Sequence, residues 1–188
     1  MKIAVIIERA NVELGGAERS VSELTEALGR RGLDVTLLAA KGVAGERTKV
    51  LASEIPQKRV PSNVYAALLK SHISAADYDI VHSTLPVGFA DVYQPRGGTY
   101  PETAVRNVSS YGCPVARTVK AVTRGANVRR GRLAAAERAL CEKQDGPVVA
   151  ALSNYVADHF QKHYDLPESR VEVIANGVDL DRPAGEVP

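Results

Sequence analysis

The chain has 188 residues, of which 45% are hydrophobic and 24% charged, and its formal net charge is +2. This globular composition suits one domain with its own core, and it excludes low-complexity, collagen-like and disulfide-stapled proteins. No apolar run approaches the roughly 18 residues that cross a bilayer, and the apolar start is too short for a signal peptide. We therefore expect a soluble, cytoplasmic protein whose two cysteines, Cys113 and Cys141, are reduced thiols.

Short runs rich in Val, Ile and Leu alternate with helical patterns along the chain. They lack strict polar–apolar alternation, which favours strands buried on both faces of a parallel sheet. The expected strands span residues 3–7, 35–38, 80–82, 148–152 and 171–174. This alternation predicts the α/β class, as a Rossmann-like, doubly wound parallel sheet with right-handed crossovers.

Three helices are expected between these strands. The first carries an apolar stripe with helical spacing and ends near Gly32, a residue suited to a C-cap. The second spans 62–76. The third follows Ser153, which suits an N-cap, and turns Val156 and Phe160 inward.

Positive charge is concentrated between Arg96 and Lys143. This stretch holds ten Lys or Arg against three Asp or Glu, and the rest of the chain has five more acids than bases. The asymmetry indicates an anionic partner, with a solvated helix face as the alternative. A helical apolar repeat runs through 115–140, but Gly125 and Gly131 each cost a helix ~1 kcal/mol relative to Ala, so we expect a break there.

A glycine pair, Gly15-Gly16, lies beyond the first strand and opens the first helix. Unpaired N–H groups and the helix dipole make such a start a seat for phosphate, while a tight turn that needs glycine is the alternative. The G-x-G-x-x-G fingerprint and the Walker loop are missing, and the second strand does not end in an acid. The sequence therefore disfavours a P-loop enzyme and a Rossmann oxidoreductase. Binding of NADH would restore the oxidoreductase hypothesis.

Four segments, in this order, resemble the N-terminal, acceptor-side domain of GT-B-fold retaining glycosyltransferases of the group 1 or family 4 type. They are Gly15-Gly-Ala-Glu-Arg19, Tyr78-Asp-Ile-Val-His82, Ala150-Ala-Leu-Ser-Asn154 and Val173-Ile-Ala-Asn-Gly-Val-Asp179. The chain is most similar to the bacterial lipopolysaccharide core glucosyltransferases, through Ala90-Asp-Val-Tyr93 and Phe160-Gln-Lys-His-Tyr164. Each motif is weak alone, but their order over nearly the whole chain is fairly specific.

The resemblance implies roles for two positions at the ends of strands. Gly15 and Gly16 would approach the diphosphate of a nucleotide-sugar donor, expected to be a UDP-sugar. His82 would be the catalytic-site residue beside the transferred sugar, hydrogen-bonded to donor or acceptor. A lone His is often structural, but the carboxyl end of a strand in an open α/β sheet is where ligands bind.

The motif Arg96-Gly-Gly-Thr99 lies between Tyr93 and Tyr100 and by analogy faces the acceptor. Arginine recognises phosphate through two hydrogen bonds, glycines let a ligand approach the backbone, and tyrosines stack on sugars; a flexible surface loop is the alternative. The expected acceptor-binding residues are Arg96, Gly97, Gly98, Thr99 and Tyr100. With the basic stretch behind them, they predict an anionic, phosphorylated or lipid-linked glycan and peripheral contact with an anionic membrane.

Residues 1–180 are expected to form this N-terminal domain and 181–188 the start of an interdomain linker, with the donor-binding C-terminal domain absent and the isolated chain inactive. Asp179-Leu-Asp181 resembles a metal motif of another fold, but we expect no metal, no cofactor beyond the nucleotide-sugar, and no nucleic acid partner.

The full enzyme would transfer a hexose in cell-envelope polysaccharide or lipopolysaccharide synthesis, retaining the anomeric configuration, at the cytoplasmic face of the inner membrane. The rival hypotheses are a non-catalytic module that binds a glycan or an anionic lipid, and a nucleotide-sugar epimerase or hydrolase with the same half-fold.

Overall fold

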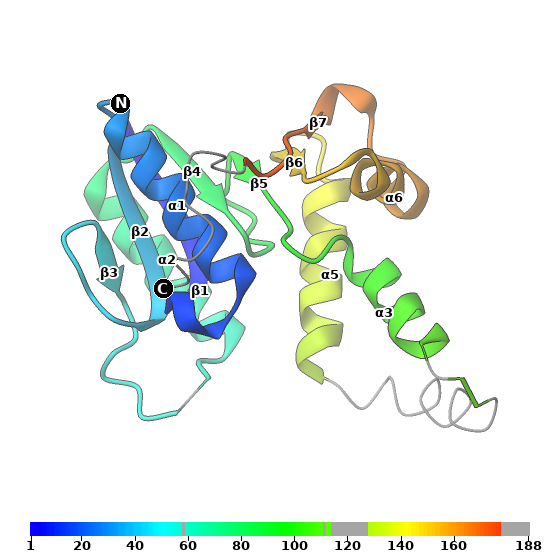
Figure 1. Cartoon of the computed structure of the whole chain (residues 1–188), viewed down its shortest axis with the longest axis horizontal. Helices are drawn as coiled ribbons and strands as arrows, with labels where there is room; N and C mark the ends of the chain where they lie inside the picture. Colours follow the sequence, from blue (N-terminus) through cyan, green and yellow to red (C-terminus); the bar gives the residue numbers. More distant parts are fainter. Residues whose placement is uncertain (58, 111, 114–127, 178–188) are drawn as a thin grey trace, which may run out of the picture.

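A computed structural model describes the chain except for residues 58, 111, 114–127 and 178–188 (Figure 1). In the described part, the strands are β1 (Lys2–Ala10), β2 (Asp34–Gly42), β3 (Thr48–Val50), β4 (Ile80–Ser83), β5 (Val92–Tyr93), β6 (Val148–Ala151) and β7 (Val171–Val173). The helices are α1 (Gly16–Arg30), α2 (Ser62–Ala76), α3 (Tyr100–Ser109), α5 (Val128–Glu142) and α6 (Asn154–Tyr164). Two short 3₁₀ turns, Val12–Leu14 and Glu168–Arg170, complete the elements.

The described strands form one sheet in the order β3-β2-β1-β4-β5-β6-β7, and every neighbouring pair is parallel. The two strands that follow β1 in the chain, β2 and β3, lie on one side of it in the sheet. The next four, β4 to β7, lie on its other side. In such sheets the crevice at the carboxyl ends of the two strands where the order reverses, here β1 and β4, is the usual ligand position. The α/β, Rossmann-like fold class is confirmed.

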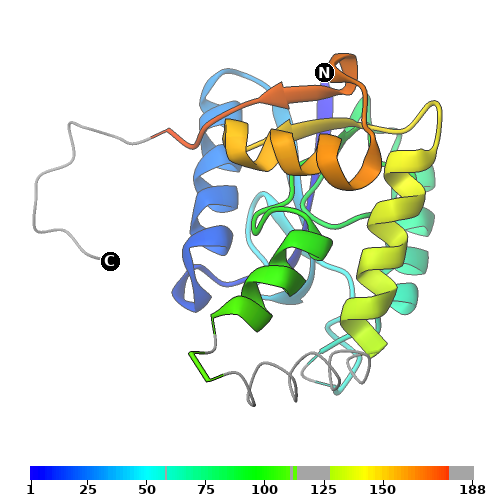
Figure 2. The ribbon, with the colours of Figure 1, turned by 90° about the vertical axis from the view of Figure 1, so that its right-hand side faces the viewer.

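Three apolar clusters make the core. Helix α1 covers one face of the sheet and α2 the other (Figure 1), and Val21 and Leu69 anchor them in two of the clusters. Helices α3, α5 and α6 gather at the β5–β7 end (Figure 2), where Phe160 is fully buried in the third cluster.

A carboxylate lies inside this third cluster. Glu137 of α5 is completely buried, and its Oε1 accepts a hydrogen bond from the Tyr93 hydroxyl at 2.7 Å. Its Oε2 accepts from the Tyr100 N–H at 2.8 Å and from the Tyr164 hydroxyl at 2.5 Å. One side chain therefore joins β5, α3, α5 and α6. Tyr93, expected to stack on a sugar, is 1% exposed and held by this carboxylate, so that expectation is wrong.

The expected elements are largely confirmed. All five expected strands exist, α2 has the expected bounds, and the Ser153 side chain caps α6 by accepting the N–H of Val156. Helix α1 ends at Arg30, and Gly32 follows its cap with φ +81°, where glycine is favoured. Helix α5 begins at Val128, within the range where we expected a break, and it continues through Gly131, because buried packing at its far end outweighs the small cost of one glycine. Gly125 lies outside the described residues, so a break on that side stays a prediction.

Candidate functional site

The glycine pair lies where α1 begins, beyond the carboxyl end of β1. Gly15 is the N-cap and Gly16 the first helical residue. Gly15 has φ 162° and ψ 178°, an extended conformation open to any residue, and a Cβ on Gly16 would have no atom within 4 Å. Neither backbone strain nor crowding therefore explains Gly16, and the space beside the helix start is open to a ligand.

His82 lies in β4, in register with Val5 of β1 and Val92 of β5. Its Nε2 lies 3.1 Å from Oε1 of Gln94, an orientation in which Nε2 carries the proton and donates it. Burial lowers the pKa of His82 below its usual 6.5, the Gln94 hydrogen bond raises it, and the positive charge of Arg96 lowers it again. A neutral imidazole at neutral pH leaves Nδ1 as an acceptor for a sugar hydroxyl.

Arg96 reaches across from the segment after β5 to α1. Its Nη1 donates to Oγ of Ser20 and to Oδ1 of Asn176, each at 3.0 Å. The Ser20 hydroxyl in turn donates to Asn176 Oδ1 at 3.2 Å. The segments that follow β1, β5 and β7 thus meet at one guanidinium.

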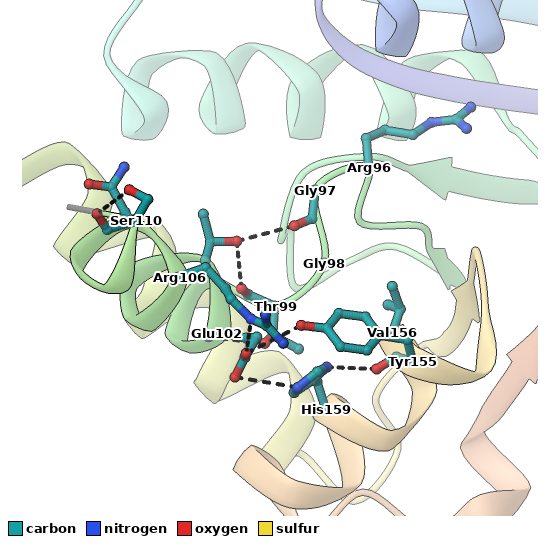
Figure 3. Close-up of a pocket in the computed structure, with 12 residues that line it drawn as sticks. Arg96, Gly97, Gly98, Thr99, Glu102, Arg106, Ser110, Tyr155, Val156 and His159 are labelled. Carbon is teal, nitrogen blue, oxygen red and sulfur yellow. Dashed lines mark hydrogen bonds and ion pairs between the residues drawn. The ribbon is translucent and has the colours of Figure 1, made fainter. Parts of the chain in front are cut away.

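A pocket of about 600 Å³ opens on the other side of the same loop, between α3 and α6 (Figure 3). It is lined by Arg96, Gly97, Gly98, Thr99, Glu102, Thr103, Arg106, Asn107, Ser110, Tyr155, Val156 and His159. Tyr155 is half exposed, with the Arg106 guanidinium 5.4 Å from its ring centroid and His159 edge-on to the ring. An exposed aromatic face among hydroxyl, amide and charged groups is suited to a sugar ring.

Glu102 is the centre of charge in this pocket. Its carboxylate accepts a hydrogen bond from Arg106 Nε at 2.9 Å, and its Oε2 lies 3.2 Å from His163 Nε2 and 3.4 Å from His159 Nε2. The hydrogen bonds from Arg106 and then His163 lower the pKa of Glu102 to about 2. This pocket wall therefore holds an ionised carboxylate, whose Oε1 also accepts a hydrogen bond from the Tyr155 hydroxyl at 3.3 Å.

The structure brings only some of the predicted site residues together. Arg96, Gly97, Gly98 and Thr99 all line the pocket. The Arg96 side chain points away from Tyr155 and His159 (Figure 3). Tyr100 begins α3 but does not line the pocket. Burial and the nearby Glu137 carboxylate raise the pKa of Tyr100 to about 12.

Sequence reasoning missed the other eight of the twelve residues that line the pocket. The chemically most distinctive of these are Glu102, Arg106, Tyr155 and His159. One local signal was present: Thr99-Tyr-Pro-Glu102 fits the capping-box pattern that starts a helix, and Thr99 Oγ1 does accept the Glu102 N–H. A helix there places Arg106 one turn after Glu102 on the same face.

The basic stretch is partly neutralised in the described residues. Arg106 pairs with Glu102, Arg129 with Glu8 at 2.5 Å, and Arg138 with Glu142 at 3.1 Å. Arg117, Lys120 and Arg124 lie outside the described residues, as do Gly125, the Asp179–Asp181 pair and the expected linker.

The described part of the chain contains no group of three or more His, Cys, Asp or Glu arranged to hold a metal ion. None of its described helices combines the length and apolar character needed to cross a bilayer.

Comparison with known proteins adds two findings. The model of the family described as Glycosyltransferase Family 4 matches residues 14–182. The crystal structure of WaaG, a glycosyltransferase involved in lipopolysaccharide biosynthesis, matches with a TM-score of 0.74 and 19% sequence identity. That match covers 95% of this chain and 46% of WaaG, so the chain spans about half the length of the structure it resembles. The fold is therefore that of one half of a GT-B glycosyltransferase. No curated protein matches the sequence.

Proposed function

Because this chain belongs to Glycosyltransferase Family 4, we propose that it is the acceptor-side, N-terminal domain of an enzyme that transfers a hexose from a nucleotide-sugar to a glycan or lipid-linked glycan. A second, donor-binding domain would complete the cleft, so the 188 residues alone would transfer little sugar. Transfer would retain the anomeric configuration and need no metal, and the product would enter cell-envelope polysaccharide or lipopolysaccharide.

One observation carries this proposal. The glycine pair after β1 and His82 of β4 belong to the two strands between which the sheet order reverses, and the family match includes both. The open space at Gly16 suits the donor diphosphate. Nδ1 of His82, which can accept a hydrogen bond, suits a hydroxyl group of the nucleotide-sugar or of the acceptor glycan. This makes His82 the candidate catalytic residue.

The acceptor would lie in the pocket between α3 and α6. Gly97, Gly98 and Thr99 supply a backbone wall, Tyr155 an aromatic face and Glu102 a hydrogen-bonding carboxylate. Arg106 at the rim is 64% exposed and paired with Glu102, and its guanidinium would donate hydrogen bonds to the glycan. We further propose that the basic stretch from Arg96 to Lys143 holds the protein at the cytoplasmic face of an anionic membrane.

The proposal is tested by calorimetric titration with UDP-glucose, UDP and a phosphorylated core oligosaccharide. Tyr155→Ala is expected to abolish oligosaccharide binding and leave UDP binding intact, while Tyr155→Phe, which keeps the ring, retains both. His82→Ala is expected to weaken UDP-glucose but not UDP, because the histidine would contact the sugar. Failure of the wild-type chain to bind any of the three would refute the assignment.

A second candidate is a non-catalytic glycan-binding module, which the pocket favours because residues of this chain alone line it. Tight oligosaccharide binding with no response to UDP or UDP-glucose would select this alternative.

A further inference from the structure

The guanidinium of Arg96 is a partly desolvated cation whose hydrogen-bond partners in the described part of the chain are neutral. Among the described residues, it donates to the Ser20 hydroxyl and the Asn176 amide oxygen, and its buried Nε finds no hydrogen-bond partner there. No carboxylate of the described residues forms an ion pair with it. Burial lowers the pKa of Arg96. A desolvated charge is unfavourable unless it is paired, so this position favours a bound anion.

The same guanidinium lies beside the start of α1. Ser20, its hydrogen-bond partner, follows Gly16 by four residues and therefore lies on the same face of the helix, one turn along. Gly16 leaves this face open. The charge of Arg96 also lowers the pKa of His82, which places the guanidinium within electrostatic reach of the imidazole. Arg96 therefore lies against α1, through a residue one turn beyond Gly16.

Arg96 is one of the residues that line the pocket between α3 and α6, but its guanidinium is directed away from the pocket's aromatic side (Figure 3). The Arg96 side chain leaves the loop on the side opposite to Tyr155 and His159 and points toward the α1 side of the domain (Figure 3). The loop from Arg96 to Thr99 therefore contacts two regions. Its glycines and threonine face the pocket, and its arginine side chain contacts α1.

We propose that Arg96 binds a diphosphate group, with its guanidinium on one side of the phosphates and the start of α1 on another. This inference rests on the proposed function and moves Arg96 from the acceptor to the diphosphate. The planar guanidinium donates to two phosphate oxygens at once, which an ammonium group does not. Ser20 and Asn176 hold it in place when the diphosphate is absent.

The diphosphate has two chemical sources, the nucleotide-sugar donor and a diphosphate-linked lipid acceptor. The test therefore uses UDP and geranyl diphosphate as separate probes on the 188-residue chain. The imidazole signal of His82, assigned with His82→Gln, is followed by NMR against pH with and without each probe. A bound diphosphate is expected to neutralise the Arg96 charge and so raise the pKa of His82.

Three substitutions complete the design. Arg96→Gln is expected to raise the pKa of His82 in the free protein and to weaken diphosphate binding about tenfold or more, the loss of one charge-assisted contact. Arg96→Lys keeps the charge but loses the planar fork, so the pKa of His82 stays low while binding still weakens. Arg30→Gln removes an equal charge from the far end of α1, where Arg30 pairs with Glu26, and is expected to change neither quantity.

The outcomes separate this inference from the proposed function. Equal UDP affinity in the wild type and Arg96→Gln would overturn the role of Arg96 and leave a donor site at Gly16 standing. A wild type that binds neither probe would overturn both. A response to geranyl diphosphate alone would support the role of Arg96 and assign it to a lipid-linked acceptor. A response to UDP would support it and assign it to the donor.

Discussion

Replacing Tyr93 with Phe tests the buried carboxylate that joins β5, α3, α5 and α6. The change removes one hydroxyl and keeps the ring. Oε1 of Glu137 has one donor, the Tyr93 hydroxyl, whereas Oε2 has two. Because Glu137 is completely buried, no water replaces the lost donor. Hydrogen bonds to charged groups contribute about 1.5–3 kcal/mol, so we expect Tyr93→Phe to cost about 2–3 kcal/mol at pH 8.

The cost is expected to depend on pH. Burial raises the pKa of Glu137 above 4.5, and the three donors lower it in part. A carboxyl with a raised folded-state pKa contributes stability that is fully present below the unfolded pKa and lost as the pH rises through the folded one. Removing the Tyr93 hydroxyl raises the folded pKa further. Tyr93→Phe should therefore destabilise much less at pH 4.5, where the carboxyl is protonated, than at pH 8.

Urea unfolding followed by circular dichroism at the two pH values measures both quantities. Tyr164→Phe is the matched control, because Oε2 keeps the Tyr100 N–H and the expected cost falls to about 1–1.5 kcal/mol. The m-values should not change, since the surface exposed on unfolding is the same. A cost for Tyr93→Phe that is independent of pH, or smaller than that of Tyr164→Phe, would refute the reasoning.

Three further predictions concern single positions. Gly42→Ala places a Cβ in a clash with the Ala10 carbonyl oxygen at φ +135° and is expected to lower the melting temperature sharply in a thermal scan; an unchanged midpoint would contradict the geometry. Gly16→Ala meets no atom, so unfolding should show equal or up to about 1 kcal/mol greater stability while calorimetry shows weaker UDP binding; unchanged UDP affinity would remove Gly16 from the site. The pKa of Glu102, about 2 through its hydrogen bond from Arg106, contributes stability above pH 4.5 that is lost as the pH falls toward 2. Glu102→Gln should therefore flatten the acid limb of a urea-unfolding series, and a limb as steep as that of the wild type would contradict this.

The sheet could be predicted from sequence wherever a strand was a continuous apolar run. Strands β3 and β5 were not predicted, because with three and two residues they are too short to show a hydrophobic pattern of their own. Their places are fixed by pairing with β2 and with β4 and β6, which is information held elsewhere in the chain. α3 escaped because Gly97-Gly98 suggested a loop, although the capping-box pattern beside it pointed to a helix.

The places of Gly16 and His82 in the fold were predictable, because at both a motif coincides with the end of a strand; their roles stay predictions. The pocket was not predictable, because Glu102 and Tyr155 are 53 residues apart and meet only when α3 packs beside α6. The direction of the Arg96 side chain was also beyond local sequence, since its partners are Ser20 and Asn176, 76 and 80 residues away.

The loop from Arg96 to Thr99 sets a length scale for the reaction. Three peptide steps span at most about 11 Å, so the groups proposed to hold the two substrates are tied at a short, fixed spacing by the chain itself. Under the proposed assignments, this spacing would keep an acceptor sugar at Tyr155 within a fixed distance of the donor diphosphate, and longer acceptors would extend outward past α3. Lengthening this loop by two residues would change the acceptor length that reacts, while the helices on either side stay in place.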